Sequence, residues 1–104
     1  MKAKLVIPRE LANHDVEQAV EYYLTVDEKR AASNFVNALG HAYELLAHHS
    51  ATGSPRYAHE LNLAGLRAWP LKKFPYIIFY VECEEHIDIW RVLHSHRDIP
   101  KWLL

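Results

Sequence analysis

The chain has 104 residues, half of them apolar and 24% charged, which is the profile of a single globular domain, 1–104, with one modest core. Its 12 Lys and Arg residues nearly balance its 13 Asp and Glu residues, so no overall field attracts it to nucleic acid or to a membrane. Any binding to an anionic partner must therefore come from a local patch.

The first predicted element is a short strand at residues 4–7, which is rich in β-branched side chains and is closed by Pro8. Proline lacks a backbone donor, so this segment is expected at the edge of a sheet or as an extended lead-in. Its apolar run is far too short for a signal peptide or a membrane span. Because Cys83 is the only cysteine, there is no disulfide framework, and we expect a cytoplasmic protein.

Two helices are predicted next. Between residues 9 and 24, apolar side chains recur at helical spacing on one face, with polar residues such as Asp15 on the others. A second helical pattern covers residues 32–46 and stops near His48 and His49. Only a few residues separate the two patterns, so the helices are expected to form an antiparallel hairpin.

Two smaller signals accompany the helices. Thr25 and Glu28 have the spacing of a capping box, and Asp27 is an alternative N-cap for the second helix. Gly40 costs stability inside a helix relative to Ala, so it suggests close contact with a neighbouring helix or with the sheet.

The second half of the chain predicts strands. Residues 50–55 form a loop by composition, and the alternation with a period of two that follows at 57–63 is typical of a strand. Strands at 66–71, 74–82 and 86–94 are joined by short turns, which predicts an antiparallel meander. The expected fold is α+β, a helix hairpin packed on a twisted antiparallel sheet in the order β-α-α-β-β-β, with 57–63 left open as one further strand.

A basic cluster in the last third of the chain is where function can be argued. Arg67 lies at the start of a strand, Arg91 interrupts an apolar strand, and Arg97 follows that strand. Arg91 is predicted to be in phase with the apolar residues Ile87, Ile89 and Leu93. An unpaired buried guanidinium is too costly, so Arg91 must face either an anion, such as phosphate or an acidic partner, or a structural ion-pair partner. The candidate ion-pair partners are Glu60, Glu82 and Asp98.

His94 and His96 could act as a general acid and base, because imidazole titrates near neutral pH. They could also bind a metal ion, but they supply two ligands at most and no cysteine or acidic cluster completes a site. Spacing alone favours two surface or capping histidines. The sequence also lacks a Gly-rich phosphate loop, a Ser-His-Asp order and paired inward carboxylates, so it predicts neither a metal nor a cofactor.

Three segments resemble a known family: residues 65–70 (GLRAWP), 76–80 (YIIFY) and 89–98 (IWRVLHSHRD). They are similar to the signature of ParE-type toxins in the RelE/ParE superfamily of type II toxin–antitoxin systems, a group that includes plasmid stabilisation systems. The helical part agrees, with Ala31, Ala32 and Phe35 in the second helix and a Gly-containing loop after it. The resemblance covers nearly the whole chain.

The resemblance implies an antitoxin partner whose C-terminal segment fills an apolar groove of the toxin, so that the two proteins form a hetero-oligomer. ParE toxins inhibit DNA gyrase, whereas toxins of the RelE branch cleave mRNA in the ribosome. Residues 91–98 are closer to ParE, so we expect a non-enzymatic gyrase inhibitor. The residues expected to bind the target are Arg67, Trp69, Arg91, His94 and Arg97.

Two other functions stay open. In a RelE-type ribonuclease, Arg67 and Arg91 would bind phosphate, and His94 or His96 would act as the general acid or base. The near-neutral charge of the chain disfavours docking on RNA, and no direct sequence-specific binding to nucleic acid is expected. The third function is that of an interaction module of the same fold with no toxicity of its own.

Overall fold

The computed structural model describes residues 3–26 and 29–103. The elements follow one another as β1 (Leu5–Pro8), α1 (Glu10–Thr25), α2 (Lys29–His48), the 3₁₀ turn η1 (Ser50–Thr52), α3 (Arg56–Leu61), β2 (Leu66–Pro70), β3 (Tyr76–Glu82), β4 (His86–His94) and α4 (Ile99–Leu103). The helices within these ranges include none that is long and apolar enough to cross a membrane.

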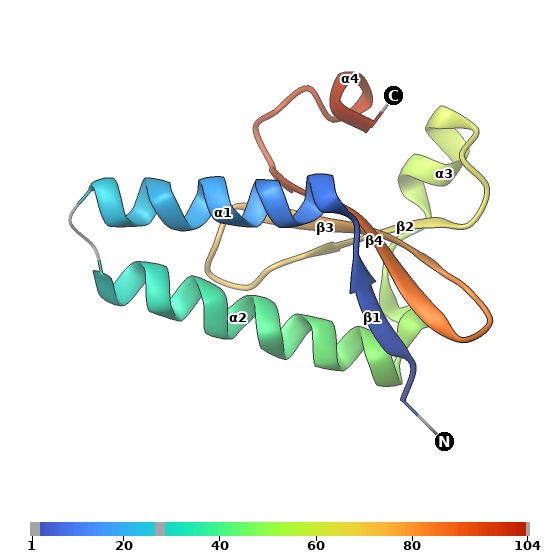
Figure 1. The fold of residues 1–104 in the computed structure, drawn as a ribbon. Coiled ribbons are helices and arrows are strands. Elements are labelled where there is room, and N and C mark those ends of the chain that lie inside the picture. Colours follow the sequence, from blue (N-terminus) through green and yellow to red (C-terminus); the bar gives the residue numbers. More distant parts are fainter. Residues whose placement is uncertain (1–2, 27–28, 104) are drawn as a thin grey trace.

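The predicted helix hairpin and the predicted meander of three strands are both confirmed, and with them the α+β class (Figure 1). The strands lie in the order β1-β4-β3-β2, and β2, β3 and β4 pair in antiparallel fashion. Short turns between the last three strands leave no room for a crossover, so this pairing follows directly from the sequence.

β1 joins the sheet in a sense that the sequence did not predict. It lies at an edge, as expected, but it pairs with β4 in parallel, from Leu5 opposite His86 to Pro8 opposite Ile89. The sheet is therefore mixed, and the prediction of a wholly antiparallel sheet is wrong at this strand. Four residues that end in proline carry no signal for strand direction. The direction is set by α1, which begins immediately after β1 and packs against β4.

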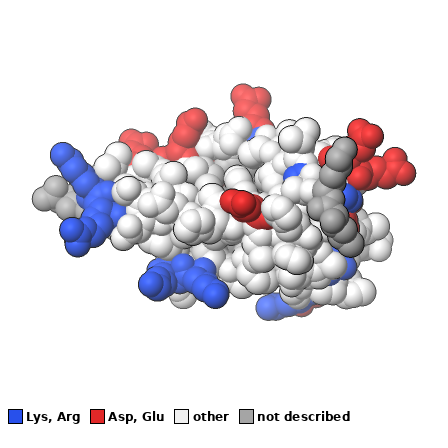
Figure 2. All heavy atoms as spheres, turned by 90° about the horizontal axis from the view of Figure 1, so that it is seen from below, with Lys and Arg blue, Asp and Glu red and all other residues white. Residues whose placement is uncertain are grey.

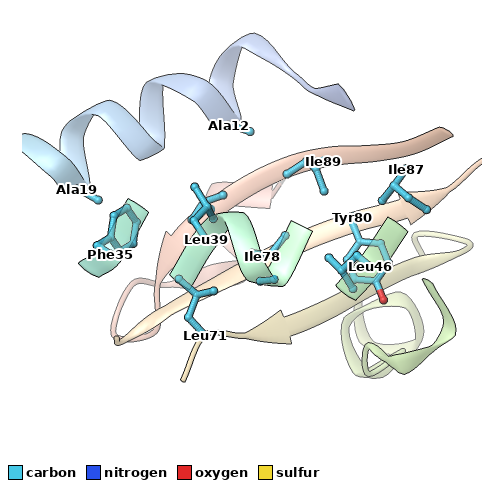
Figure 3. Packing of buried hydrophobic residues seen from close by; sticks show 12 residues of the cluster. Ala12, Ala19, Phe35, Leu39, Leu46, Leu71, Ile78, Tyr80, Ile87 and Ile89 are labelled. Atoms are coloured by element: carbon cyan, nitrogen blue, oxygen red, sulfur yellow. The ribbon is translucent and has the colours of Figure 1, made fainter. Parts of the chain in front are cut away.

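The two helices of the hairpin cover one face of the sheet and bury the larger core there. Phe35, Leu39 and Leu46 of α2 face Ile78 of β3 and Ile89 of β4, and all five are buried (Figure 3). Full burial of side chains of this size stabilises the fold by about 1.5–3 kcal/mol each. This layer fixes the position of α1 and α2 above the strands.

The opposite face of the sheet carries a smaller core. Phe79 of β3 and Leu93 of β4 pack there with Ile99 at the start of α4. α3 adds Tyr57, whose ring centroid lies 5.3 Å from that of Phe79 in an edge-to-face arrangement. α4 was not predicted from the sequence, and it is held by Ile99 and Leu103, which lie one helical turn apart.

The further strand left open at residues 57–63 does not form. Residues Arg56–Leu61 are a short helix, α3, which ends at Asn62 in the left-handed conformation with φ of 55°. Tyr57, Ala58 and Leu61 are its half-buried residues, a helical spacing that the apparent alternation conceals. In so short a segment, a period of two and a helical period cannot be told apart. Packing against the sheet decides which of the two structures forms.

The prediction that Gly40 marks a close contact is also wrong. Gly40 is exposed on α2, and a Cβ built there would have no atom within 4 Å. The close approach occurs instead at Gly53, where an added Cβ would overlap the side chain of Tyr80. The Tyr80 hydroxyl donates to the Ser50 carbonyl at 2.6 Å and accepts from the Gly53 N–H at 2.9 Å.

Two of the predicted capping residues, Asp27 and Glu28, lie outside the described residues. The third, Thr25, ends α1, and its hydroxyl donates to the Glu21 carbonyl at 2.8 Å. That bond belongs to the last turn of α1 and not to the start of α2.

We predict that Gly40→Ala raises the free energy of unfolding by about 1 kcal/mol, because it removes the entropic cost of glycine in an exposed helix without creating a clash. Urea denaturation measures the effect. Gly53→Ala is the control and should destabilise the protein, since its methyl group would displace the Tyr80 hydroxyl from both hydrogen bonds. A Gly40→Ala protein no more stable than the parent would contradict the open surroundings of this position.

Candidate functional site

β4 contains a bulge immediately before Arg91. Phe79 pairs with Arg91 but the next residue of β3, Tyr80, pairs with Ile89, so Trp90 is an extra residue in the bulged strand. A β-bulge of this kind leaves one residue unpaired and changes which face the following side chains occupy.

The bulge overturns the predicted phase of Arg91. Ile87 and Ile89 belong to the core beneath the helix hairpin, whereas Leu93 belongs to the core on the opposite face. Because these apolar residues lie on opposite faces of the sheet, Arg91 cannot be in phase with Ile87, Ile89 and Leu93 together. It lies where β4 extends beyond the end of β1, and from that open edge its side chain reaches α1.

Arg91 forms a buried, bidentate ion pair with Asp15 of α1. Its Nε and Nη2 donate to the two carboxylate oxygens, each at 2.7 Å, and the side chains of Arg91 and Asp15 are only 14% and 5% exposed. Oδ2 of Asp15 also accepts from the Val92 N–H at 3.1 Å, and Nη1 of Arg91 donates to the Trp102 carbonyl at 3.1 Å. The hydrogen bonds with Asp15 raise the pKa of Arg91. Arg91 is thus a structural residue that joins β4, α1 and α4.

The ion-pair interpretation of Arg91 is correct, but the predicted partners are wrong. Glu60 pairs with Arg56 at 3.1 Å and Glu82 pairs with Lys4 at 2.8 Å, while Asp98 forms no ion pair among the described residues. The prediction that Asp15 lies on a polar face of its helix is wrong as well. A signal was present, because Asp15 lies three residues after Ala12 and four before Ala19, and both alanines are buried.

Two other candidates also serve the fold. Nη1 of Arg67 donates to the carbonyl oxygens of Gly53 at 2.8 Å and Ala51 at 3.3 Å, so it ties the loop before α3 to β2. Trp69 is half-buried against the core beneath α1 and α2. Neither residue lies beside the histidines of the C-terminal cluster.

The structure does bring His94, His96 and Arg97 together. They line a hollow of about 330 Å³ between α1 and the end of β4, which we call the β4 notch. Its lining consists of Asp15, Gln18, Ala19, Tyr22, Tyr76, Val92, His94, His96 and Arg97. The ring of His94 lies 5.2 Å from those of Tyr76 and His96, and the Arg97 guanidinium lies 4.2 Å from the ring centre of Trp102.

The protonation of His94 is biased by these neighbours. The backbone N–H of His96 donates to Nδ1 of His94 at 3.1 Å, so a neutral His94 ring carries its proton on Nε2. Burial, followed by the nearby positive charges of His96 and Arg97, lowers the pKa of His94 below its usual value. The ring is therefore mostly neutral at physiological pH.

A second and larger hollow, the α2 groove, lies between α2 and the region of β2 and the β2–β3 turn. Its volume is about 810 Å³. Its apolar lining consists of Ala38, Ala42, Leu45, Trp69, Leu71 and Phe74, and its polar lining consists of Asn34, Asn37, His41, Lys72 and Lys73. Figure 2 looks at the molecule from the side on which α2 lies. Most of the middle of this view is uncharged apart from an acidic side chain near its centre, and Lys and Arg lie towards the margins.

Metal-ligating side chains are not clustered in either hollow within the described part of the chain. Among residues 3–26 and 29–103, no three His, Cys, Asp or Glu side chains are placed to hold a metal ion. Cys83 is a half-buried free thiol in the turn between β3 and β4, and its carbonyl accepts from Lys4 Nζ at 2.7 Å.

Comparison with known proteins shows what the chain is similar to. A family model described as "ParE toxin of type II toxin-antitoxin system, parDE" matches residues 6–99. A solved structure titled "Chromosomal ParDE TA system from P. aeruginosa" is similar to the chain with a TM-score of 0.76 and 16% identity, and the match covers 90% of this chain and 98% of the other. At this identity the structure shows the shared fold alone. A search of curated proteins found no match.

We predict that Arg91→Met lowers the free energy of unfolding by about 3–5 kcal/mol, because it leaves the Asp15 carboxylate buried without its partner. Arg9→Met is the matched control. Arg9 forms an equivalent bidentate pair with Asp88, at 3.0 and 2.9 Å, but its side chain is 53% exposed, so its loss should cost less than about 1 kcal/mol. Urea denaturation compares the two variants, and equal costs would show that burial does not set the strength of the Asp15 pair.

Proposed function

The chain belongs to the ParE toxin family of type II toxin–antitoxin systems, and on this basis we propose that it is a cytoplasmic toxin that inhibits DNA gyrase and is neutralised by a cognate antitoxin. It does so by binding, without cleaving a substrate. The family match and the shared fold support the proposal that the chain is a toxin. The arrangement of its arginines favours an inhibitor over a ribonuclease.

The Asp15–Arg91 pair is the observation that favours a binding inhibitor over a ribonuclease. A RelE-type ribonuclease needs cationic side chains that are free to stabilise the charge developing on a phosphate. Arg91 is committed to Asp15 at 2.7 Å, and Arg67 donates to backbone carbonyls at the other side of the meander. The two arginines and the two histidines of the ribonuclease mechanism therefore do not converge on one phosphate position.

Of the residues expected to bind the target, His94 and Arg97 remain as exposed or half-exposed candidates. They lie together at the β4 notch, where a partner protein can reach them. Arg91 acts on this surface indirectly, since it holds the end of α4 through the Trp102 carbonyl. Arg67 anchors a loop, and Trp69 packs against the core and also lines the α2 groove.

The α2 groove supports the antitoxin contact. Its apolar walls fit the apolar side of a helix, and the lysines of the β2–β3 turn would meet acidic residues at the margin of that helix. Addition of a strand to β2 is less favourable, because Ser54 and Ala68 already exchange two backbone hydrogen bonds of 2.9 Å at its outer edge. We therefore favour a helix in the groove.

Expression of the chain alone tests the proposal. Filamentous cells with damaged DNA, together with loss of supercoiling when the purified chain is added to gyrase, are expected. Arg97→Ala should weaken both effects, whereas Arg30→Ala, which removes an exposed arginine from the start of α2, should leave them intact. Rapid arrest of translation with cleaved mRNA would favour the ribonuclease instead, and unimpaired growth would favour a non-toxic interaction module.

Lys72→Glu tests the groove. The reversed charge at the margin should weaken antitoxin binding roughly fivefold to tenfold at low salt and less at high salt, with toxicity unchanged. Lys101→Glu, the same change on the exposed side of α4, is the control and should leave antitoxin affinity as it is. Binding is measured by calorimetry with the protein encoded beside the toxin. Equal effects of the two substitutions would place the antitoxin elsewhere.

A further inference from the structure

The β4 notch exists because β1 is shorter than β4. β1 ends at Pro8, opposite Ile89, whereas β4 continues to His94. The outer edge of the last part of β4 is therefore free of a strand neighbour, and α1 crosses beside it. Asp15 satisfies one backbone donor at this edge, the Val92 N–H. The remaining space between α1, the end of β4 and the following turn is the notch.

The charge balance of the notch is positive. The one carboxylate in its lining, Asp15, is neutralised by Arg91 at 2.7 Å. Arg97 is exposed, lies over the ring of Trp102, and has no ion-pair partner in the described part of the chain. Its charge is therefore available to an anion, which it can bind through two parallel N–H donors.

The neutral groups of the notch can also donate hydrogen bonds. The Nδ1 atom of His94 is occupied as an acceptor by the His96 N–H, so Nε2 is the donor of the neutral ring. Gln18 contributes an amide, whose Nε2 also lies 3.2 Å from Nε2 of His14, and Tyr22 and Tyr76 contribute aromatic rings with hydroxyl groups. Donors from α1, from β3 and from the turn after β4 thus surround one hollow.

We propose that the β4 notch binds a phosphate group, held by Arg97, His96 and the Nε2 atom of His94. The hollow, about 330 Å³, is larger than a bare phosphate and has the size of a small-ligand site. The rings of Tyr22 and Tyr76 can pack on a group attached to that phosphate, as aromatic side chains do with nucleobases. The ligand class is therefore a nucleotide, either free or as one unit of a nucleic-acid strand. Purified protein tests this site without an assay of toxicity. The phosphate site can therefore be confirmed or refuted independently of the proposed toxin function.

Binding should strengthen as pH falls. The titratable groups that face His94 are Asp15 and Tyr22 of α1, Tyr76 of β3, and His96 and Arg97 of the turn. Of these, Asp15 is already paired, while burial and the two positive neighbours lower the pKa of His94. A bound anion offsets that repulsion and favours the protonated His94 ring, so protonation of His94 and anion binding strengthen one another.

NMR titration of the full-length chain tests the site, with the ring signals of His94 and His96 as reporters. Sulfate is the probe for pH dependence, because it stays doubly charged while His94 titrates. Its affinity should be roughly three- to fivefold higher at about pH 5.5 than at about pH 7.5. Arg97→Ala and His96→Gln should each weaken binding by a similar factor. The matched controls, Arg30→Ala and His59→Gln, remove the same groups from exposed positions on α2 and α3 and should have no effect.

Two further probes at a single pH distinguish a free nucleotide from a nucleic-acid strand as the source of the phosphate. Adenosine monophosphate binding more tightly than a dinucleotide with one internal phosphodiester would assign the site to free nucleotides. The reverse order would assign it to a nucleic-acid strand. Affinity for sulfate that is equal at both pH values, or equal in the Arg97→Ala and Arg30→Ala proteins, would overturn the proposal, as would the absence of shifts at His94 with both nucleotide probes.

Discussion

The buried ion pair between Asp15 and Arg91 is the interaction on which the arrangement of this protein depends. The pair joins the first helix to the last strand, and Arg91 extends it to the carbonyl of Trp102 in the C-terminal helix. Burial of two charges carries a large desolvation cost, which is offset only when every donor and acceptor is satisfied. Here both carboxylate oxygens accept from the guanidinium and one also accepts from the Val92 N–H, so only one position of α1 along β4 satisfies the pair.

The same strand offers a comparison between a buried and a more exposed ion pair. Arg9 and Asp88 form a pair with the same bidentate geometry, and each arginine also lies over a tryptophan ring, at 4.7 Å for Arg9 and 5.6 Å for Arg91. The Arg9 pair is open to water, where Coulomb attraction is weak and salt screens it. The same bidentate geometry thus forms a surface contact near the start of β4 and a buried link between β4 and α1 nearer its end.

The two proposed binding surfaces lie on different parts of the molecule. With Arg91 neutralised, the positive charge of the C-terminal cluster comes from Arg97, which lines the β4 notch together with His94 and His96. The apolar α2 groove lies on the side of β2, at the opposite edge of the sheet. An antitoxin helix in the groove would therefore leave the notch open, unless the antitoxin continues around the hairpin. Inhibition of a target and neutralisation by an antitoxin need not compete for the same residues.

The sequence by itself determined the helix hairpin, the antiparallel meander and the family, because periodicity and short turns are local properties of the chain. The motif around residues 65–70, 76–80 and 89–98 was likewise readable without a structure. Only the tertiary structure decided that β1 is parallel, that residues 56–61 form a helix, and that Asp15 is the partner of Arg91. Each of these depends on contacts between segments that are distant in the chain; Asp15 and Arg91 are 76 residues apart. The bulge at Trp90 shows the reason most clearly, since one unpaired residue reverses which face each later side chain occupies, and no local pattern records it.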